Sequence, residues 1–209
     1  MFYGTRISLF IGIATVLLTG IAGTLLGLVA GYVRTLDGVL MRIMDGFMAF
    51  PALMLAVAIT ATLGPSSINA VVALAAVYIP RTARVVRASA LVVSQLDYVE
   101  SARVLGCSES RILWRHILPN CLGPLIVQLT FVFAYAVLSE AALSFLGMGT
   151  PPPTPTLGAV IAEGRDYVRE APWICLFPGL ALLICVLGLN LMGDGLRDRF
   201  DPRRSAGEP

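Results

Sequence analysis

Few residues in this 209-residue chain have side chains suited to catalysis or to metal binding. All fifteen basic residues are arginines, so the chain lacks the lysine that a Walker A loop places against phosphates and that Schiff-base enzymes use. His116 is the only histidine, and a lone histidine is more often a hydrogen-bonded polar group than a metal ligand. The four cysteines have no metal-like spacing and are expected to be inert: Cys107, Cys121, Cys175 and Cys185. The sequence therefore predicts no catalytic residue, no metal site, no cofactor and no nucleotide-binding motif in this chain.

At two places in the sequence, charged side chains lie inside apolar stretches. Glu140 has no other charge within one helical turn, and a lone carboxylate at the centre of a membrane helix costs about 2.5–3.5 kcal/mol. We expect Glu140 either to line a translocation path or to accept a structural hydrogen bond from a neighbouring helix. Arg42 and Asp45 are three residues apart and share a helix face, which predicts a structural ion pair, with a gating role as the alternative.

Composition identifies the elements that must hold these residues. The chain is 57% hydrophobic and only 13% charged, with a mean hydropathy of +0.83, whereas charged residues make up about a quarter of a soluble domain. Five apolar stretches are long enough to cross a bilayer: residues 7–33, 39–63, 68–88, 122–148 and 172–192. Backbone groups surrounded by lipid must be satisfied internally, so we expect helices. The sequence predicts an all-α polytopic membrane protein with five transmembrane helices, whose net charge of +2 does not suggest nucleic acid as a partner.

The arginines predict the orientation of these spans. The connecting segments on one side, together with the span ends that adjoin them, hold twelve arginines, whereas the other side holds three, so the arginine-rich side should be cytoplasmic. The segment at 95–119 and the tail at 201–209 are then cytoplasmic, and the loop at 149–171 lies outside. Five spans would also leave the N-terminus outside, six residues before the first helix. A further span upstream would remove that difficulty.

A row of small residues marks the first span. Gly23, Gly27 and Gly31 recur every four residues and form one ridge of a helix. Such ridges let two helices approach closely. We expect a packing seam here, with a pore-lining role as the alternative.

The cytoplasmic segment at 95–119 reads as two short amphipathic helices separated by Gly106, which can adopt the left-handed conformation that ends a helix. Tyr98, Ala102 and Leu105 form a modest apolar face on the first helix, and Pro119 is expected to end the second. The segment is either a hairpin that packs on its own spans or a docking element for a soluble partner.

Several motifs resemble those of one family. Glu100-Ser101-Ala102, followed by Gly106 and then by Leu118-Pro119, resembles the EAA loop of permease subunits of ATP-binding-cassette (ABC) importers. Ser101 stands at the middle position of Glu-Ala-Ala, where that motif has alanine, and His116 stands where it has isoleucine. Four other stretches resemble the dipeptide, oligopeptide and nickel branch of these permeases: residues 3–9, 49–53, 139–147 and 178–198.

The resemblance implies a permease subunit of an ATP-driven, binding-protein-dependent importer of peptides in a bacterial inner membrane. Its partners would be two cytoplasmic ATPase subunits that bind ATP and Mg, a second related permease, an extracytoplasmic substrate-binding protein and membrane lipid. Residues 1–200 would form one permease domain. The residues that would couple it to the ATPases are Glu100, Ser101, Ala102, Gly106, Cys107, Ser108, Leu118 and Pro119.

Two alternatives remain open from the sequence. Members of the family have six spans, and the first of these precedes the stretch that resembles residues 3–9. A truncated, inactive permease is therefore one alternative. A secondary transporter or channel that needs no ATPase is the other alternative. Such proteins place several ionisable groups near the midplane, where only Glu140 lies here.

Overall fold

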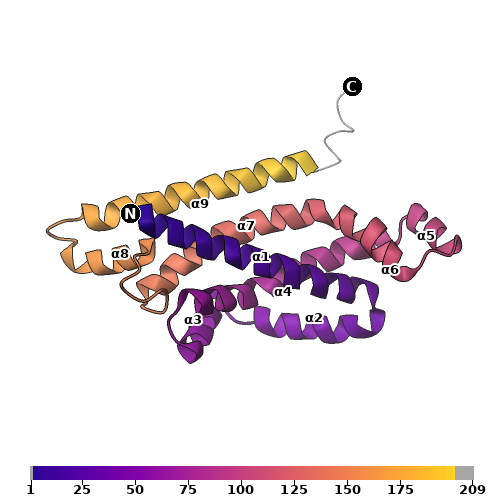
Figure 1. Ribbon diagram of the computed structural model, residues 1–209, viewed down its shortest axis with the longest axis horizontal. Coiled ribbons are helices and arrows are strands. Elements are labelled where there is room, and N and C mark those ends of the chain that lie inside the picture. The colour runs from indigo at the N-terminus through magenta and orange to yellow at the C-terminus, as the bar shows by residue number, and fades with distance from the viewer. Residues whose placement is uncertain (1, 201–209) are drawn as a thin grey trace, which may run out of the picture.

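Long apolar helices build the molecule. The computed structural model describes residues 2–200, and every regular element in that range is helical (Figure 1). Four helices lie along the longest axis: α1 (Phe2–Tyr32), α4 (Ser67–Ser94), α7 (Leu118–Phe145) and α9 (Trp173–Phe200). Each is long and apolar enough to cross a membrane. The prediction of an all-α polytopic membrane protein is confirmed.

The pairing of α1 with α4 holds the centre of the bundle. Gly23 lies against the side chain of Thr82, and a Cβ atom on Gly27 would come within 2.5 Å of the carbonyl oxygen of Ala83. Gly31 continues the same contact one turn further along α4. The absence of side chains on this ridge therefore brings the two backbones together, and the predicted packing seam is confirmed.

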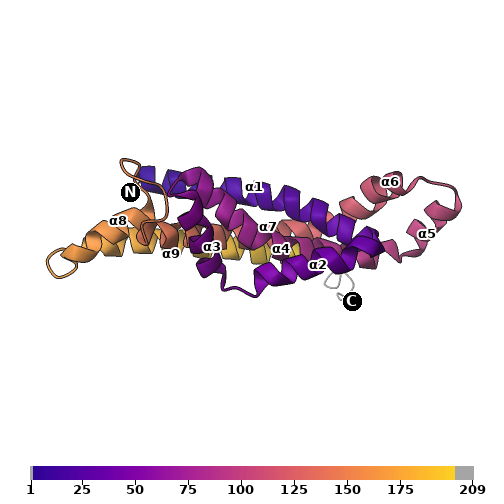
Figure 2. The same ribbon diagram turned by 90° about the horizontal axis from the view of Figure 1, so that it is seen from below.

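The second predicted span is not a single helix. Residues 39–63 are divided between α2 (Arg34–Met48) and α3 (Ala52–Leu63), which are bent by 91° relative to each other. Pro51 stands at the break, and its missing N–H and fixed φ prevent a continuous helix. Figure 2 shows α2 lying along the bundle while α3 turns across it. The count of five spans holds if the bent pair counts as one broken span.

The two segments between spans lie at opposite ends of the bundle. The loop predicted at 149–171 contains α8 (Leu157–Gly164) and a 3₁₀ turn at Arg165–Tyr167, close to the start of α1 (Figure 1). The segment predicted at 95–119 contains α5 (Asp97–Val104) and α6 (Glu109–Ile112) at the other end. We call these the α8 end and the coupling end. The predicted tail at 201–209 lies outside the described residues.

Candidate functional site

The coupling segment, residues 97–117, begins with α5 and turns sharply at Gly106. Gly106 has φ of +81°, a conformation that side-chain-bearing residues rarely adopt. Its N–H donates to the carbonyl of Arg103 at 3.0 Å, and the N–H of Cys107 donates to the carbonyl of Ala102 at 3.1 Å. These two bonds are the Schellman pattern that closes a helix C-terminus. The prediction that Gly106 ends the first helix is confirmed.

The second half of the segment differs from the prediction. Pro119 does not end a helix, because α6 continues through a π turn at Leu113–Ile117 directly into α7. Proline is tolerated in the first turn of a helix, where its missing N–H breaks no hydrogen bond of that helix. The wider π turn that precedes Pro119 lets the chain continue into α7. The side-chain amide of Asn120 donates to the carbonyl of His116 at 2.7 Å. The coupling segment is therefore joined to α7 without a loop.

Buried apolar side chains anchor the coupling segment to the spans. Val99, Ile112 and Ile117 are fully buried. They belong to one core cluster with residues of three long helices: Leu28 of α1, Val86, Ala90 and Val93 of α4, and Cys121 and Leu125 of α7. A force applied to α5 or α6 is therefore transmitted to α1, α4 and α7 by direct packing.

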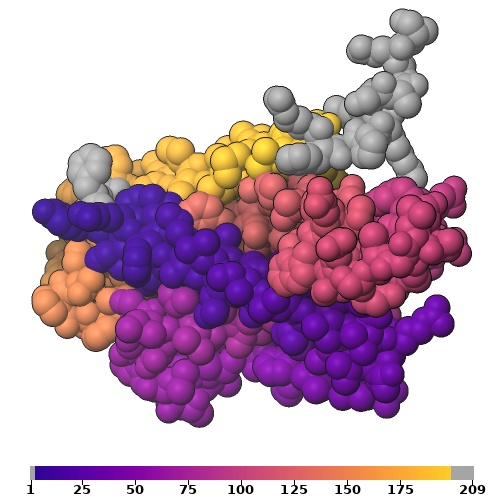
Figure 3. Space-filling view, turned by 45° about the vertical axis from the view of Figure 1, so that its right-hand side comes forward, coloured from indigo at the N-terminus to yellow at the C-terminus, as the bar shows by residue number. Residues whose placement is uncertain are grey.

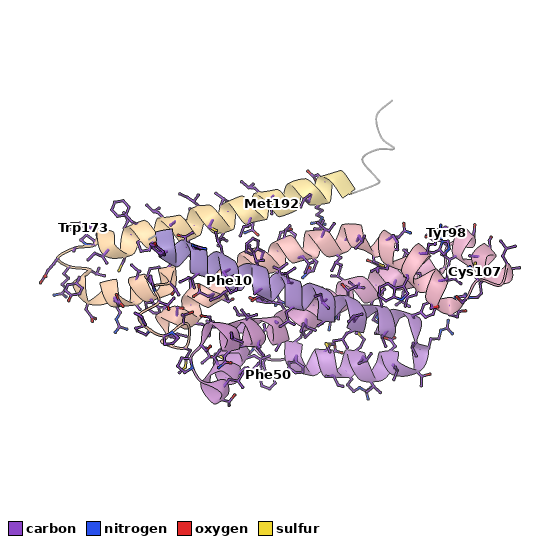
Figure 4. All side chains as sticks on the ribbon, viewed as in Figure 1. Phe10, Phe50, Tyr98, Cys107, Trp173 and Met192 are labelled. Carbon is purple, nitrogen blue, oxygen red and sulfur yellow. The ribbon has the colours of Figure 1, made fainter. Side chains whose placement is uncertain are left out.

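The opposite side of α5 is exposed, and two large apolar side chains lie uncovered at its C-terminal end. Val104 and Leu105 are 82% and 84% exposed, the highest values among the large apolar side chains that the structure describes. They flank a shallow depression of about 490 Å³ that Asp97, Glu100 and Ser101 also line. Figure 3 shows the coupling segment, in rose, at the right-hand end of the molecule, and Figure 4 shows Cys107 at this end, far from Trp173. Of the modest apolar face predicted for the first helix, Ala102 is buried and Leu105 is exposed.

The predicted coupling residues divide by exposure. Those that face solvent are Glu100, Ser101, Gly106, Ser108 and Pro119. Cys107 and Leu118 are half-buried and pack against the core cluster, and Ala102 is buried. The sequence analysis missed Val104, and it also missed Trp114, which is 57% exposed. The signal for Val104 and Leu105 was two large apolar residues directly before the glycine of an otherwise polar segment.

The groups considered for metal binding lie apart. His116 packs beside Tyr98, with ring centroids 6.1 Å apart. All four cysteines are free. Among residues 2–200, no three histidine, cysteine or acidic side chains come close enough together to hold a metal ion.

Glu140 lies at the α8 end, buried among packed helices. Its side chain is fully buried, and it accepts hydrogen bonds from Ser8 of α1 at 2.6 Å and from Ser144 at 2.7 Å. The hydroxyl of Thr156, directly before α8, is a third hydrogen-bond partner. The expected hydrogen bond from a neighbouring helix is present, and a role of Glu140 in a translocation path stays a prediction. The carboxylate joins α1, α7 and α8.

The predicted ion pair of Arg42 with Asp45 is also wrong. Asp45 pairs instead with Arg84 of α4, at 2.5 Å between Nη2 and Oδ1. Asp37, two turns earlier on α2, accepts two hydrogen bonds from Arg87 of α4. The spacing rule concerns neighbours on one helix, whereas here the acidic side chains of α2 face the arginines of α4. These pairs attach the first half of the broken span to the bundle.

Comparison with known proteins shows to which family the chain belongs. Residues 23–206 match the family described as the inner membrane component of binding-protein-dependent transport systems. The chain belongs to this family. It is thus a multi-pass inner-membrane permease of the ABC importer class, which works with a substrate-binding protein and an ATPase.

Individual relatives support this placement of the permease. A peptide transport system permease protein of Brucella suis is 56% identical over 201 residues, which cover 96% of this chain and 68% of that protein. The dipeptide transport system permease protein DppC of Escherichia coli K12 is 51% identical, with 97% and 68% covered. The inward-facing MetNI methionine ABC transporter shares the fold, with a TM-score of 0.71 at 21% identity over 96% of this chain and 97% of that one.

Proposed function

We propose that this permease subunit imports peptides of the dipeptide and oligopeptide class, and that its coupling segment receives the motion of an ATPase. The named activities of the Brucella suis and Escherichia coli relatives support the substrate class. One observation carries the coupling role: Val104 and Leu105 face outward on α5, while Val99 on the same helix is buried in the core of three spans. An apolar patch on a rigid, anchored element fits a protein partner.

The proposed mechanism is mechanical. An ATPase subunit binds the depression lined by Glu100, Ser101, Val104 and Leu105, and Gly106 sets the angle between α5 and α6. When the ATPase moves on closing around ATP, α5 moves with it. Because the π turn that ends at Ile117 joins the coupling segment directly to α7, α7 tilts relative to α1 and α4. This tilt changes the side of the membrane from which the substrate path is open.

The partners follow from this role. We propose that residues 1–200 act as one non-catalytic permease domain beside a second, related permease, with two ATPase subunits that hold ATP and Mg. A substrate-binding protein would deliver the peptide at the α8 end. The coupling end and the C-terminus would then be cytoplasmic, as the arginine distribution predicts.

The test uses the whole importer in proteoliposomes, with the ATPases and the binding protein. Gly106→Asp forces a side chain into φ of +81°, and no atom lies within 4 Å of the new Cβ, so the change strains the turn without a clash. We expect peptide uptake to fall by about tenfold or more with normal membrane insertion, since a shift of 1.4 kcal/mol in coupling is tenfold. Gly64→Asp is the control, because Gly64 has φ of +86° and equally open surroundings in the turn between α3 and α4, and its ψ of 157° makes an added side chain at least as strained there.

The comparison of the two variants decides the proposal. Equal uptake by both would show that the turn at Gly106 has no special part in transport. Failure of the ATPase to co-purify with the unsubstituted chain would contradict the coupling role directly.

A further inference from the structure

Three arginines follow one another on α4 at intervals of three residues, and their surroundings differ. Arg84 pairs with Asp45, and Arg87 pairs with Asp37. Arg81 is exposed half-way along α4, and no hydrogen bond or ion pair joins it to any residue between 2 and 200. An arginine within a membrane span is costly unless it faces a partner or water. Arg81 therefore faces either water or a partner outside this chain.

Arg81 lies in a groove whose walls are mostly apolar, with a few polar side chains among them. A cavity of about 440 Å³ between α2, α4 and α7 is lined by Tyr78, Arg81, Gln128 and Tyr135, together with Arg84. The Tyr78 hydroxyl is held by Ser139 at 2.8 Å, so this wall is fixed. Tyr135 is 50% exposed and free to face a ligand. The groove thus offers one guanidinium with amide and phenol groups around it.

The groove continues toward the coupling end. A second cavity of about 430 Å³ shares Val85, Gln128 and Phe131 with the first, so the two are adjacent along α4 and α7. Its far wall contains Pro124 near the start of α7 and Arg197 near the end of α9. A solute leaving Arg81 would therefore meet a second guanidinium on its way to the coupling end.

We propose that Arg81 binds the C-terminal carboxylate of the peptide as it passes along this groove; the inference rests on the proposed function. A guanidinium presents two parallel N–H groups that match the two oxygens of a carboxylate, which is the one charge that every unmodified peptide carries at its C-terminus. Two sites in series also suit transport, because the substrate must be able to leave each of them. Pro80, directly before Arg81, removes one backbone hydrogen bond from the otherwise continuous α4 at this depth.

The main competing explanation is a fixed ion pair between Arg81 and an acidic residue of the second permease. The two explanations differ in whether water reaches position 81 in the assembled importer. A residue on a substrate path is in contact with water, whereas a residue in a packed helix interface is not. A cysteine at this position therefore distinguishes them.

The experiment uses the complete importer in proteoliposomes, with the four native cysteines replaced by alanine and with Arg81→Cys added. We expect dipeptide uptake to fall about tenfold, and a cationic methanethiosulfonate reagent to restore it to at least about half, because the lost interaction is a charge-assisted bond. The neutral methyl and the anionic sulfonate reagents should react without restoring uptake. Ile184→Cys on the exposed apolar side of α9, 67% exposed, is the matched control and should neither react nor alter uptake.

The outcomes separate this inference from the function on which it rests. If the unsubstituted importer takes up no peptide, the proposed function fails and this inference fails with it. If uptake occurs but survives Arg81→Cys, or the cysteine does not react, or the variant no longer retains the second permease, this inference alone is overturned. Restoration by the anionic reagent would overturn it as well, since the added group would have the wrong charge for a carboxylate.

Discussion

The two ends of the bundle differ in whether their charged and apolar side chains are buried among partners of the same chain. At the α8 end, Glu140 is fully buried, and three hydroxyl groups of the same chain surround its carboxylate. At the coupling end, Glu109 pairs with Arg103 at 3.3 Å, but both side chains are about half exposed. There the large apolar residues Val104 and Leu105 face outward as well. One end is complete within this chain, and the other presents surface for another chain to cover.

Whether a side chain is buried with its partners or left exposed distinguishes structural from functional side chains better than residue type does. A buried charge with all its partners in the same chain holds helices in place, because removing it leaves unpaired polar groups away from water. An exposed apolar pair on an anchored helix adds nothing to the stability of the isolated chain. Stability and association should therefore respond to changes at different ends.

The largest effect on stability is expected from Glu140→Leu. The change removes the acceptor of the Ser8 and Thr156 hydroxyls, and leaving buried donors unpaired costs about 2–4 kcal/mol in total. The measurement is the thermal unfolding midpoint of the purified permease in detergent. Glu109→Leu is the matched control, because an exposed ion pair contributes less than about 1 kcal/mol. Equal losses for the two variants would contradict the contrast between the ends.

A smaller loss is expected from Gly158→Ala in α8. A Cβ atom there would overlap the backbone carbonyl of Ala141, so α8 would have to move away from α7, at a cost of about 1–3 kcal/mol. Gly188→Ala in α9 is the control, since nothing lies within 4 Å of its Cβ, and alanine is the better helix former. The same unfolding measurement applies. A midpoint for Gly158→Ala at or above that of the unsubstituted permease would show that the α8 end is loosely packed.

Much of the fold follows from patterns that are local in the sequence. Long uncharged runs are enough to place α1, α7 and α9, and Gly106 was recognisable because few residues can close a helix in this way. The bend at Pro51 was harder to predict from the sequence. Proline within a membrane helix is often tolerated, so composition alone does not distinguish a kink from a turn of 91°.

The side-chain partners were the least predictable part. Ser8 and Glu140 are 132 positions apart, and Asp45 and Arg84 are 39 apart, so only the packing of helices brings them together. Leu105 lies beyond the last turn of α5, which ends at Val104, so the helical period does not predict where its side chain points. The motif located the turn at Gly106 between two short helices, whereas the exposed apolar side chains beside it required the structure.

The smallest effect on the chain itself is expected from the double change Val104→Ser and Leu105→Ser. Both side chains are more than four-fifths exposed, so their removal from α5 should change the free energy of unfolding by less than about 0.5 kcal/mol. Their loss should nevertheless weaken association with the ATPase by tenfold or more, because burying two such apolar side chains at an interface contributes about 1.5–3 kcal/mol each. The measurement is the amount of ATPase that co-purifies with the permease. Tyr167→Ser, 55% exposed at the α8 end, is the control and should leave both quantities unchanged. Unaltered ATPase retention by the double variant would mean that the patch is covered by something other than the ATPase, and a lowered unfolding midpoint would mean that Val104 and Leu105 already have partners within this chain.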